Sequence, residues 1–495
     1  MSVKVNLLAN YVGQFWVAAA AFLFIPLYIK FLGVEAYGVI GFFAVLQAGM
    51  SILDAGVAPA LNREIALYSV GRSTGAPRLI RSFEILGFLF FLFFASLLYL
   101  LSDWVSGGWL RSASISDDQI NFSIVIMGGV VFLRFFEALY KSVLVGFQRQ
   151  VLLNFFNVLF STIRNGGAAV VLMFDGASLE RFFVWQLFTS FGAVLVCSIV
   201  VYKLLPMREI GFFVDFDCLA NVKKFALGAM SAAVLAFCLG QMDKILLSYN
   251  LTLIEFSHYA LSATVAGVLS LLVGPVSQAI YPHLVSIDLF SSRVFYYRQA
   301  VRVVSLVLTP VATAFVFFPK IIIYGWSGSY ELSEAVSVYL PLLAAGNLFS
   351  GIMVLPFMLE YVSGRVSLVL KANFFAVVFF CFFLLLVVPV WGGIGAALGW
   401  FFLNFSYFIF MGWLLHKDFA LKDRLGWYFV DVLLPGAISA AIFFLGGLFF
   451  GVDAEGRWLG LFTVFIFWFF SVLVVAVTMY FTGGVFFVTK RRKFS

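Results

Sequence analysis

Charged residues are scarce in this chain, and that scarcity excludes a soluble fold. Asp, Glu, Lys and Arg make up 11% of the 495 residues, whereas soluble domains contain about 25%. Hydrophobic residues make up 63%, and 64 residues are Phe. The composition is that of a polytopic membrane protein, so the net charge of +7 does not indicate nucleic acid binding.

Motifs for a metal site, a disulfide or a catalytic site are also lacking. The four cysteines lie in or beside hydrophobic stretches without metal-ligand spacing, and the three histidines fall near the ends of predicted helices. Phosphate-binding and dinucleotide-binding glycine motifs are absent, and no nucleophile arrangement is evident. The sequence therefore predicts a protein that is not an enzyme, needs no metal or cofactor and does not itself couple to ATP.

Long apolar runs predict fourteen transmembrane helices, because each run is long enough to cross a bilayer. A charged connector after the sixth run divides them into six helices, six helices and a terminal pair. We therefore predict an all-α polytopic membrane protein. Its parts are an N-terminal bundle at 1–204, an interfacial linker at 205–222, a C-terminal bundle at 223–416 and a terminal helix pair with a basic tail at 417–495. The runs lie at 8–29, 38–61, 82–102, 119–146, 152–174, 181–202, 225–248, 256–281, 300–323, 334–357, 366–388, 392–415, 428–450 and 458–481.

The placement of Lys and Arg predicts the orientation of the chain in the membrane. An even number of helices puts both termini on the same side. With the N-terminus in the cytoplasm, most of the 31 Lys and Arg residues fall in inner loops and tails, in agreement with the positive-inside rule. We therefore expect both termini in the cytoplasm.

Two neighbouring predicted helices, 119–146 and 152–174, carry polar residues to mid-membrane depth. Arg134, Glu137 and Lys141 recur at helical spacing, so they point the same way and Glu137 can pair with either cation. An unpaired charge at this depth costs at least about 3 kcal/mol, so these side chains should face the protein interior or a watered cavity. The second helix presents its polar residues within one arc, namely Asn154, Asn157, Ser161, Arg164 and Asn165.

Two interpretations of these charges remain open. Arg134 and Glu137 could form a structural ion pair that locks two helices together. Alternatively, the excess of cations over acids favours a cavity for an anionic substrate, because Arg and Lys match the charge and geometry of phosphate.

Three further charges fall within predicted helices. Asp54 lies just before a Gly/Pro break and could couple to an ion or cap that break. Neighbouring residues on a helix point about 100° apart, so we expect one of Asp243 and Lys244 to face the cavity while the other packs between helices.

The first predicted helix carries a neutral polar line, Asn6, Asn10 and Gln14, which fits substrate lining and helix packing equally well. We assign to substrate binding Arg134, Lys141, Arg164, Lys244, Asn10, Gln14, Asn154, Asn157 and Ser161. We assign to ion coupling or structural pairing Asp54, Glu137 and Asp243.

Several stretches resemble Wzx-type flippases of polysaccharide biosynthesis, which share a superfamily with multidrug and toxic-compound extrusion transporters. The stretches that carry this resemblance are FLGVEAYG at 31–38, LDAGVAPALNREIA at 53–66, GQMDKILLS at 240–248, Tyr259 and YPHL at 281–284. Within these motifs, Asp54 and Arg63 match the family's motif at the inner end of the second helix. Asp243 and Lys244 match the family's motif on the seventh helix.

The resemblance implies two six-helix bundles around a central cavity and alternating access. It implies a substrate made of an oligosaccharide repeat unit on undecaprenyl diphosphate, moved from the cytoplasmic to the periplasmic leaflet of a bacterial inner membrane. O-antigen, exopolysaccharide or capsule synthesis would use such a flippase, with a proton or sodium ion for coupling, membrane lipid around it, and a polymerase and chain-length regulator as partners.

Three alternatives stay open. A lipid II flippase and an ion-coupled multidrug antiporter belong to the same superfamily, although a cationic cavity disfavours a drug antiporter. A membrane-embedded glycan polymerase or ligase is a different class, and the short predicted outer loops argue against it.

Overall fold

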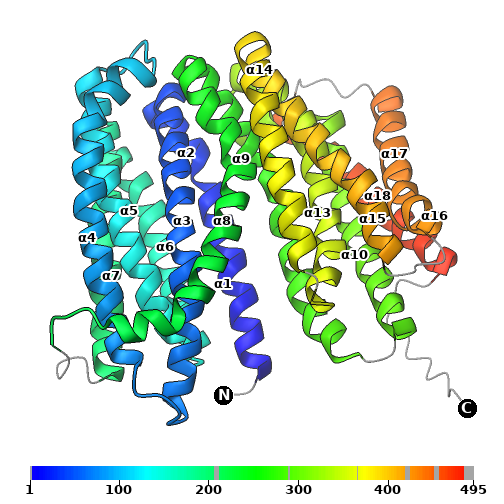
Figure 1. Ribbon diagram of the computed structural model, residues 1–495. Coiled ribbons are helices and arrows are strands. Elements are labelled where there is room, and N and C mark those ends of the chain that lie inside the picture. Colours follow the sequence, from blue (N-terminus) through cyan, green and yellow to red (C-terminus); the bar gives the residue numbers. More distant parts are fainter. Residues whose placement is uncertain are drawn as a thin grey trace, which may run out of the picture. The chain divides into compact units, whose positions relative to one another are not determined.

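The computed structural model describes residues 3–174, 176–205, 211–287, 290–364, 366–418, 424–450 and 456–483. These ranges are helical with short connecting turns, and they contain no β-strand, only an isolated bridge between Arg111 and Thr252 (Figure 1). The predicted all-α polytopic membrane fold is confirmed.

The chain divides into two compact units, Met1–Ser257 and His258–Ser495. The predicted boundaries between bundles, linker and terminal pair stay predictions. The first unit holds α1 (Val3–Leu23), α2 (Ile25–Leu32), α3 (Val34–Ser69), α4 (Ala76–Trp104), the π-helix η1 (Val105–Trp109), α5 (Asp117–Gly146), α6 (Gln150–Phe174), α7 (Leu179–Leu204) and α8 (Phe216–Asn250).

The second unit begins within α9 (Leu253–Ser286). It continues with α10 (Phe290–Phe317), α11 (Pro319–Ser327), α12 (Tyr330–Ser337), α13 (Leu340–Val362), α14 (Val366–Ser406), the π-helix η3 (Tyr407–Met411), α15 (Gly412–Asp418), α16 (Arg424–Gly426), the π-helix η4 (Trp427–Leu433), α17 (Leu434–Phe450) and α18 (Arg457–Gly483).

The described residues contain 13 helices that are long and apolar enough to cross a membrane, one fewer than predicted. The difference arises in Ser367–Lys417, a span of 51 residues that includes two predicted helices. Gly392 breaks it with φ 51° and ψ −134°, a backbone conformation that favours glycine. The two arms then pack on each other, since a Cβ on Gly399 would lie 3.0 Å from the Phe383 ring. The span therefore contains both predicted helices.

Three other predicted helices, 8–29, 300–323 and 334–357, are interrupted in the structure. In each case a proline occupies the first turn of the helix that follows the interruption, because proline tolerates that position but cannot donate a helical hydrogen bond. These prolines are Pro26 of α2, Pro319 of α11 and Pro341 of α13.

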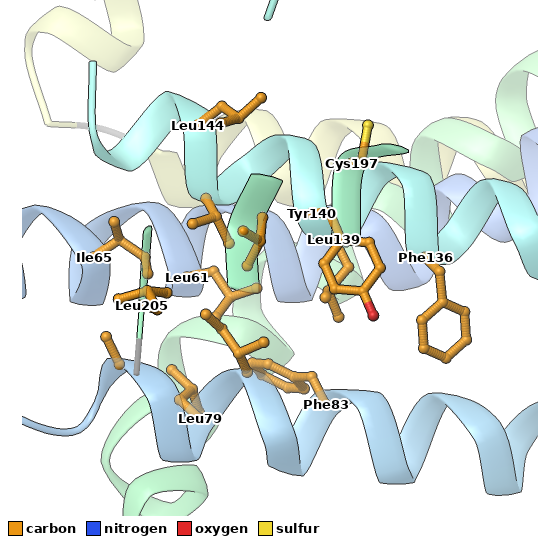
Figure 2. Close-up of a cluster of buried hydrophobic side chains, with 14 of the residues drawn as sticks. Leu61, Ile65, Leu79, Phe83, Phe136, Leu139, Tyr140, Leu144, Cys197 and Leu205 are labelled. Atoms are coloured by element: carbon orange, nitrogen blue, oxygen red, sulfur yellow. The ribbon is translucent and has the colours of Figure 1, made fainter. Parts of the chain in front are cut away.

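A core of buried apolar side chains joins six helices of the first unit, α3 to α8 (Figure 2). Leu61 and Ile65 of α3 are fully buried, and Leu79 of α4 and Leu139 of α5 are 1% exposed. Cys197 of α7 completes this layer and is a free, buried cysteine. This core fixes the rotation of α5 about its axis and thereby the direction of its polar side chains.

Polar contacts hold the terminal helices of the second unit against α10 and α11. Thr309 of α10 lies 3.3 Å from the hydroxyl of Ser439 on α17, and Ser471 of α18 donates to the same hydroxyl at 2.9 Å. Arg457 at the start of α18 donates to the carbonyl of Gly325, near the end of α11, at 3.0 Å. The terminal helix pair is therefore an integral part of this unit.

Glycine allows α3 to approach the start of α9 closely. A Cβ on Gly38 would lie 2.5 Å from the Ser257 hydroxyl and 2.7 Å from the Leu253 carbonyl oxygen, whereas one on Gly49 would meet the Phe237 ring at an ordinary 3.6 Å. We expect Gly38→Ala to destabilise the protein by roughly 1–3 kcal/mol, because backbone must move to admit the methyl group.

The measurement is the melting temperature of both variants in detergent. Gly49→Ala is the matched control on the same helix and should melt at or slightly above the temperature of the unmodified protein, since alanine favours helix more than glycine does. Equal melting temperatures for the two variants would contradict the close approach at Gly38.

Candidate substrate-binding site

A tight turn brings the two polar helices α5 and α6 together. The Ser116 hydroxyl caps the start of α5 by accepting a hydrogen bond from the N–H of Gln119. At the other end, Gln148 adopts a positive φ of 57° between α5 and α6. The short connection makes the helices antiparallel neighbours, so residues near the middle of each can meet.

Glu137 is the centre of the charged cluster. Its carboxylate is buried, with the side chain 6% exposed, and each oxygen binds one cation. The Lys141 Nζ lies 2.5 Å from Oε1, and the Arg164 Nη2 lies 2.7 Å from Oε2. Lys141 is one turn away on α5, and Arg164 comes from α6. This single carboxylate therefore joins the two helices, and of the two cations on its own helix it pairs with Lys141.

Arg134 has neutral partners instead. Its guanidinium donates to the side-chain oxygen of Gln47 on α3 and, at 3.0 Å, to that of Gln186 on α7. It also lies 5.4 Å from the centroid of the Phe43 ring. The ion pair considered between Arg134 and Glu137 is not present among the described residues. Arg134 therefore forms no ion pair among the described residues, and its charge adds to those of Lys141 and Arg164.

The cluster as a whole has more positive than negative charge. Arg134, Lys141 and Arg164 surround one acid, Glu137, which gives a local excess of two positive charges. The side chains of Lys141 and Arg164 are 19% and 14% exposed, so neither is sealed in the core. Partly accessible guanidinium and ammonium groups can bind an anion through charge-assisted hydrogen bonds.

The neutral polar residues of α6 divide between packing and partial exposure. Asn154 is buried against α1, where a Cβ on Gly13 would clash with its amide oxygen. Ser161 is also buried and accepts a hydrogen bond from Asn165 at 3.3 Å. Asn157 is half-buried. A substrate contact by Asn154 or Ser161 would require α1 or α6 to move, and these assignments stay predictions.

The polar line of the first helix is described only in part. Gln14 is exposed. The side chains of Asn6 and Asn10 lie outside the described residues, although the backbone there is helical.

Asp243 and Lys244 on α8 pair with each other. Asp243 is 3% exposed, and the Lys244 Nζ lies 3.2 Å from its Oδ1 and 2.8 Å from the carbonyl of Gly240. The lysine side chain is long and flexible, so Lys244 reaches Asp243 although adjacent positions on a helix point in different directions. Helix geometry alone did not indicate this pair. Lys244 is 21% exposed at its side chain, so part of it remains accessible.

Asp54 is half-buried on α3. No hydrogen bond or ion pair links it to another of the described side chains. Two residues further on, Gly56 is packed against Met230 of α8. Asp54 therefore lies on a stretch of α3 that closely contacts α8.

A second charged cluster, in the second unit, was missed in the sequence. Asp431 of η4 is fully buried and accepts hydrogen bonds from Arg298 and Arg302 of α10 at 2.6 and 2.7 Å. Next to it, the Tyr297 hydroxyl lies 2.9 Å from Nε2 of buried His416. Both arginines lie at or just before the start of the predicted helix at 300–323, where the positive-inside rule already expects cations. Their i, i+4 spacing and an acid inside the apolar run WYFVDVLLP are the signals that could have revealed the cluster.

The described residues include no group of three or more His, Cys, Asp or Glu side chains arranged to hold a metal ion.

Removing the acid at the centre of the cluster should destabilise the first unit. We expect Glu137→Gln to cost about 3–5 kcal/mol, because Lys141 and Arg164 lose their shared partner in a buried site. Lys141→Gln should cost less, since the pair between Arg164 and Glu137 remains. Melting temperatures in detergent measure both effects, and a loss in Lys141→Gln as large as that in Glu137→Gln would show that the carboxylate is not the centre of the cluster.

Comparisons with known proteins agree with the fold and the membrane setting. No protein-family model matches the chain. The "Putative O-antigen transporter" of Shigella flexneri is 20% identical over 372 residues, which cover 74% of this chain and 87% of that protein. Among solved structures, the lipid II flippase MurJ in an inward closed conformation superposes with a TM-score of 0.74 at 13% identity, covering 97% of this chain and 99% of that one.

A multidrug resistance MATE family transporter of the MOP superfamily, in an inward-facing conformation, superposes with a TM-score of 0.61 at 15% identity, covering 85% of this chain and 96% of that one. These relatives are named as transporters and flippases, and the predicted resemblance to their superfamily is confirmed. The chain is thus a multi-pass membrane protein with the fold of the MOP superfamily of flippases and transporters.

Proposed function

We propose that this protein is a flippase that moves an oligosaccharide linked to undecaprenyl diphosphate from the cytoplasmic to the periplasmic leaflet of a bacterial inner membrane. It would do so by alternating access and would serve O-antigen, exopolysaccharide or capsule synthesis. The observation that carries the proposal is the excess of cations in the α5–α6 cluster, where Glu137 binds Lys141 and Arg164 and Arg134 adds a third cation held by neutral amides.

The charge of the proposed substrate suits this cluster. A diphosphate diester carries two negative charges, which equal the local excess of two positive charges. Arg134 is the cation most available to it, because its present partners are the neutral amides of Gln47 and Gln186. A phosphate oxygen can replace an amide oxygen as acceptor, and the bond to an ionised group is about twice as strong.

The other parts of the substrate would meet different surroundings. Sugar hydroxyls can exchange hydrogen bonds with neutral side chains such as Gln47, Gln186 and the half-buried Asn157. The lipid tail would stay in the bilayer, because its transfer to water is unfavourable by about 0.8 kcal/mol for each methylene.

The biological setting rests on separate observations. The relative from Shigella flexneri is named for O-antigen transport, which supports a polysaccharide pathway, a polymerase and a chain-length regulator as partners, and an inner-membrane location. The excess of Lys and Arg in the predicted inner loops supports cytoplasmic termini.

Two other substrates compete within the same fold. A solved relative is a lipid II flippase, and lipid II also carries a diphosphate, so the cluster alone does not separate it from other lipid-linked glycans. Another is a multidrug transporter, but lipophilic cations would be repelled by a site with surplus positive charge. The sign of the charge therefore favours a diphosphate-linked lipid over a cationic drug.

Asp54 is our proposed site for ion coupling. It is a half-buried acid within a membrane-spanning helix, without an ion pair among the described residues, on the part of α3 that packs against α8. Protonation, or binding of a sodium ion, would remove or offset its charge. That change could favour one conformation of the contact between α3 and α8 over another.

The first test measures flipping of an undecaprenyl-diphosphate oligosaccharide in proteoliposomes that contain equal amounts of each variant. We expect Arg134→Ala and Arg164→Ala to reduce the rate about tenfold or more, because each removes a charged hydrogen-bond donor. Arg134→Lys and Arg164→Lys should keep part of the activity, because the charge remains.

Arg149→Ala is the control, since Arg149 is exposed next to the turn between α5 and α6, and it should flip at the normal rate. Full activity in both alanine variants of the cluster would remove the argument for an anionic substrate. Efflux of a cationic drug without flipping of any glycan lipid would favour the antiporter.

The second test concerns coupling. We expect Asp54→Asn to flip without a gradient as the unmodified protein does, but to lose acceleration by an imposed proton or sodium gradient, because the amide cannot take part in charge exchange. Asp217→Asn, which changes an exposed acid in the first turn of α8, should keep that acceleration. If Asp54→Asn responds to the gradient normally, Asp54 is a structural residue at the helix break.

A further inference from the structure

A pocket of about 630 Å³ opens between α5 and α7. Its described lining residues are Tyr140 of α5 and Ser198, Ile199, Tyr202 and Lys203 of α7. Arg134, Lys141 and Arg164, the cations of the proposed transport site, are not among them. The pocket is therefore a separate candidate site in the first unit.

The two tyrosines that line this pocket belong to a closed hydrogen-bond network. The hydroxyls of Tyr140 and Tyr202 donate to the Glu84 carboxylate at 2.9 and 3.1 Å, and in Figure 2 the Tyr140 hydroxyl points toward α4, which carries Glu84. Arg81 donates to the same carboxylate at 2.8 Å and to the Tyr202 hydroxyl at 2.9 Å. Arg81 thus neutralises Glu84, and Lys203 is the lining residue whose charge is available to a ligand.

Exposed aromatic residues place the pocket at the level of lipid headgroups. Phe212, Phe213 and Phe216 are 85%, 52% and 74% exposed in the segment that leads into α8. The Phe212 ring covers the Arg81 guanidinium, with 4.5 Å between the guanidinium carbon and the ring centroid. Aromatic side chains that are exposed at the end of a membrane span are typical of the interface between bilayer and water.

The same segment is fixed to α4 rather than hanging free. The N–H of Asp215 donates to the Ser82 hydroxyl at 2.9 Å, and the Asp215 carboxylate caps α8 by accepting from the N–H of Cys218 at 3.0 Å. This cap lowers the pKa of Asp215 and keeps its carboxylate charged. The aromatic residues are therefore held at one depth relative to the pocket.

Along α7, an apolar stripe leads directly to this pocket. It consists of exposed apolar side chains three or four residues apart, and one more turn of the helix reaches Lys203. Its members are Phe188, Phe191, Leu195 and Ile199, which are 67%, 57%, 49% and 48% exposed. An acyl chain that lies on this stripe would bring its headgroup to the pocket.

We propose that this pocket binds the phosphate of an anionic glycerophospholipid, with its acyl chains on the stripe of α7. The ligand is a structural lipid of the first unit and not cargo. Lys203 supplies the positive charge, which is needed because the carbonyl end of α7 repels a phosphate. The Ser198 hydroxyl donates to the Leu195 carbonyl at 2.9 Å and would turn from it to donate to the phosphate. The tyrosine rings form the apolar wall beside the glycerol backbone.

Native mass spectrometry of the full-length, delipidated protein in detergent tests this assignment, with phosphatidylglycerol and phosphatidylethanolamine as probes. The unmodified protein should bind phosphatidylglycerol more tightly. Lys203→Gln should weaken binding of phosphatidylglycerol about fivefold, the effect of one lysine near a charged lipid, and leave phosphatidylethanolamine binding unchanged. Lys203→Arg should keep the preference.

Lys224→Gln is the matched control, because it removes an exposed cation near the start of α8 and should have no effect. Ser198→Trp fills the pocket without changing charge and should weaken phosphatidylglycerol binding as well. A melting temperature for each variant separates misfolding from loss of the ligand.

Three results would overturn the proposal. Lys203→Gln could bind phosphatidylglycerol as tightly as the unmodified protein. Lys224→Gln could lose the preference equally, which would indicate diffuse attraction to the basic end of the unit. Undecaprenyl phosphate could displace phosphatidylglycerol when added at a small fraction of its concentration, which would assign the pocket to the transport substrate.

Discussion

The pairing of buried charge is the constraint on which the rest of this structure depends. In hydrocarbon, a carboxylate without a partner is far too costly to keep ionised, so its position dictates which helices must meet. Glu137 requires two cations and obtains them from α5 and α6. Asp431 imposes the same condition in the second unit and obtains two arginines from α10. Each unit thus has a buried acid bound by two cations and retains a net positive charge around it.

Local geometry explains which parts of the fold and site could be predicted. Length and hydropathy are properties of a single helix, so the membrane spans and the shared face of Glu137 and Lys141 follow from the sequence. The sequence does not show whether Arg134 or Lys141 is the partner of Glu137. Arg134 lies three positions before Glu137 and Lys141 four positions after it, and both positions are equally near on a helix. The approach of Arg164 from α6 decides the arrangement: one carboxylate oxygen faces α6, and the other takes Lys141.

The missed features depend on contacts between segments that are distant in sequence. Gln47 and Gln186 are 139 positions apart in the chain, and nothing local marks them as the two amides that hold Arg134. Asp431 lies in a run that is otherwise strongly apolar, so the hydropathy of the run gives no sign of a buried acid. Arg298 and Arg302 belong to a helix whose cations would also fit an inner loop. Tertiary pairing identifies these residues, and a single sequence contains no direct record of it.

The positive cluster also has a consequence for the energy source of the proposed transport. Two negative charges that move outward across a membrane with a negative interior gain about 4.6 kcal/mol for each 100 mV of potential. A flippase for a diphosphate-linked glycan can therefore use the membrane potential alone if its own charge stays fixed. If an ion binds at the proposed site, Asp54, and moves down its gradient, it would add to this driving force, but it is not needed to reverse an unfavourable step. In the proposed transport, the surplus of cations would lower the cost of holding the diphosphate at mid-membrane depth, where the barrier to its passage is highest.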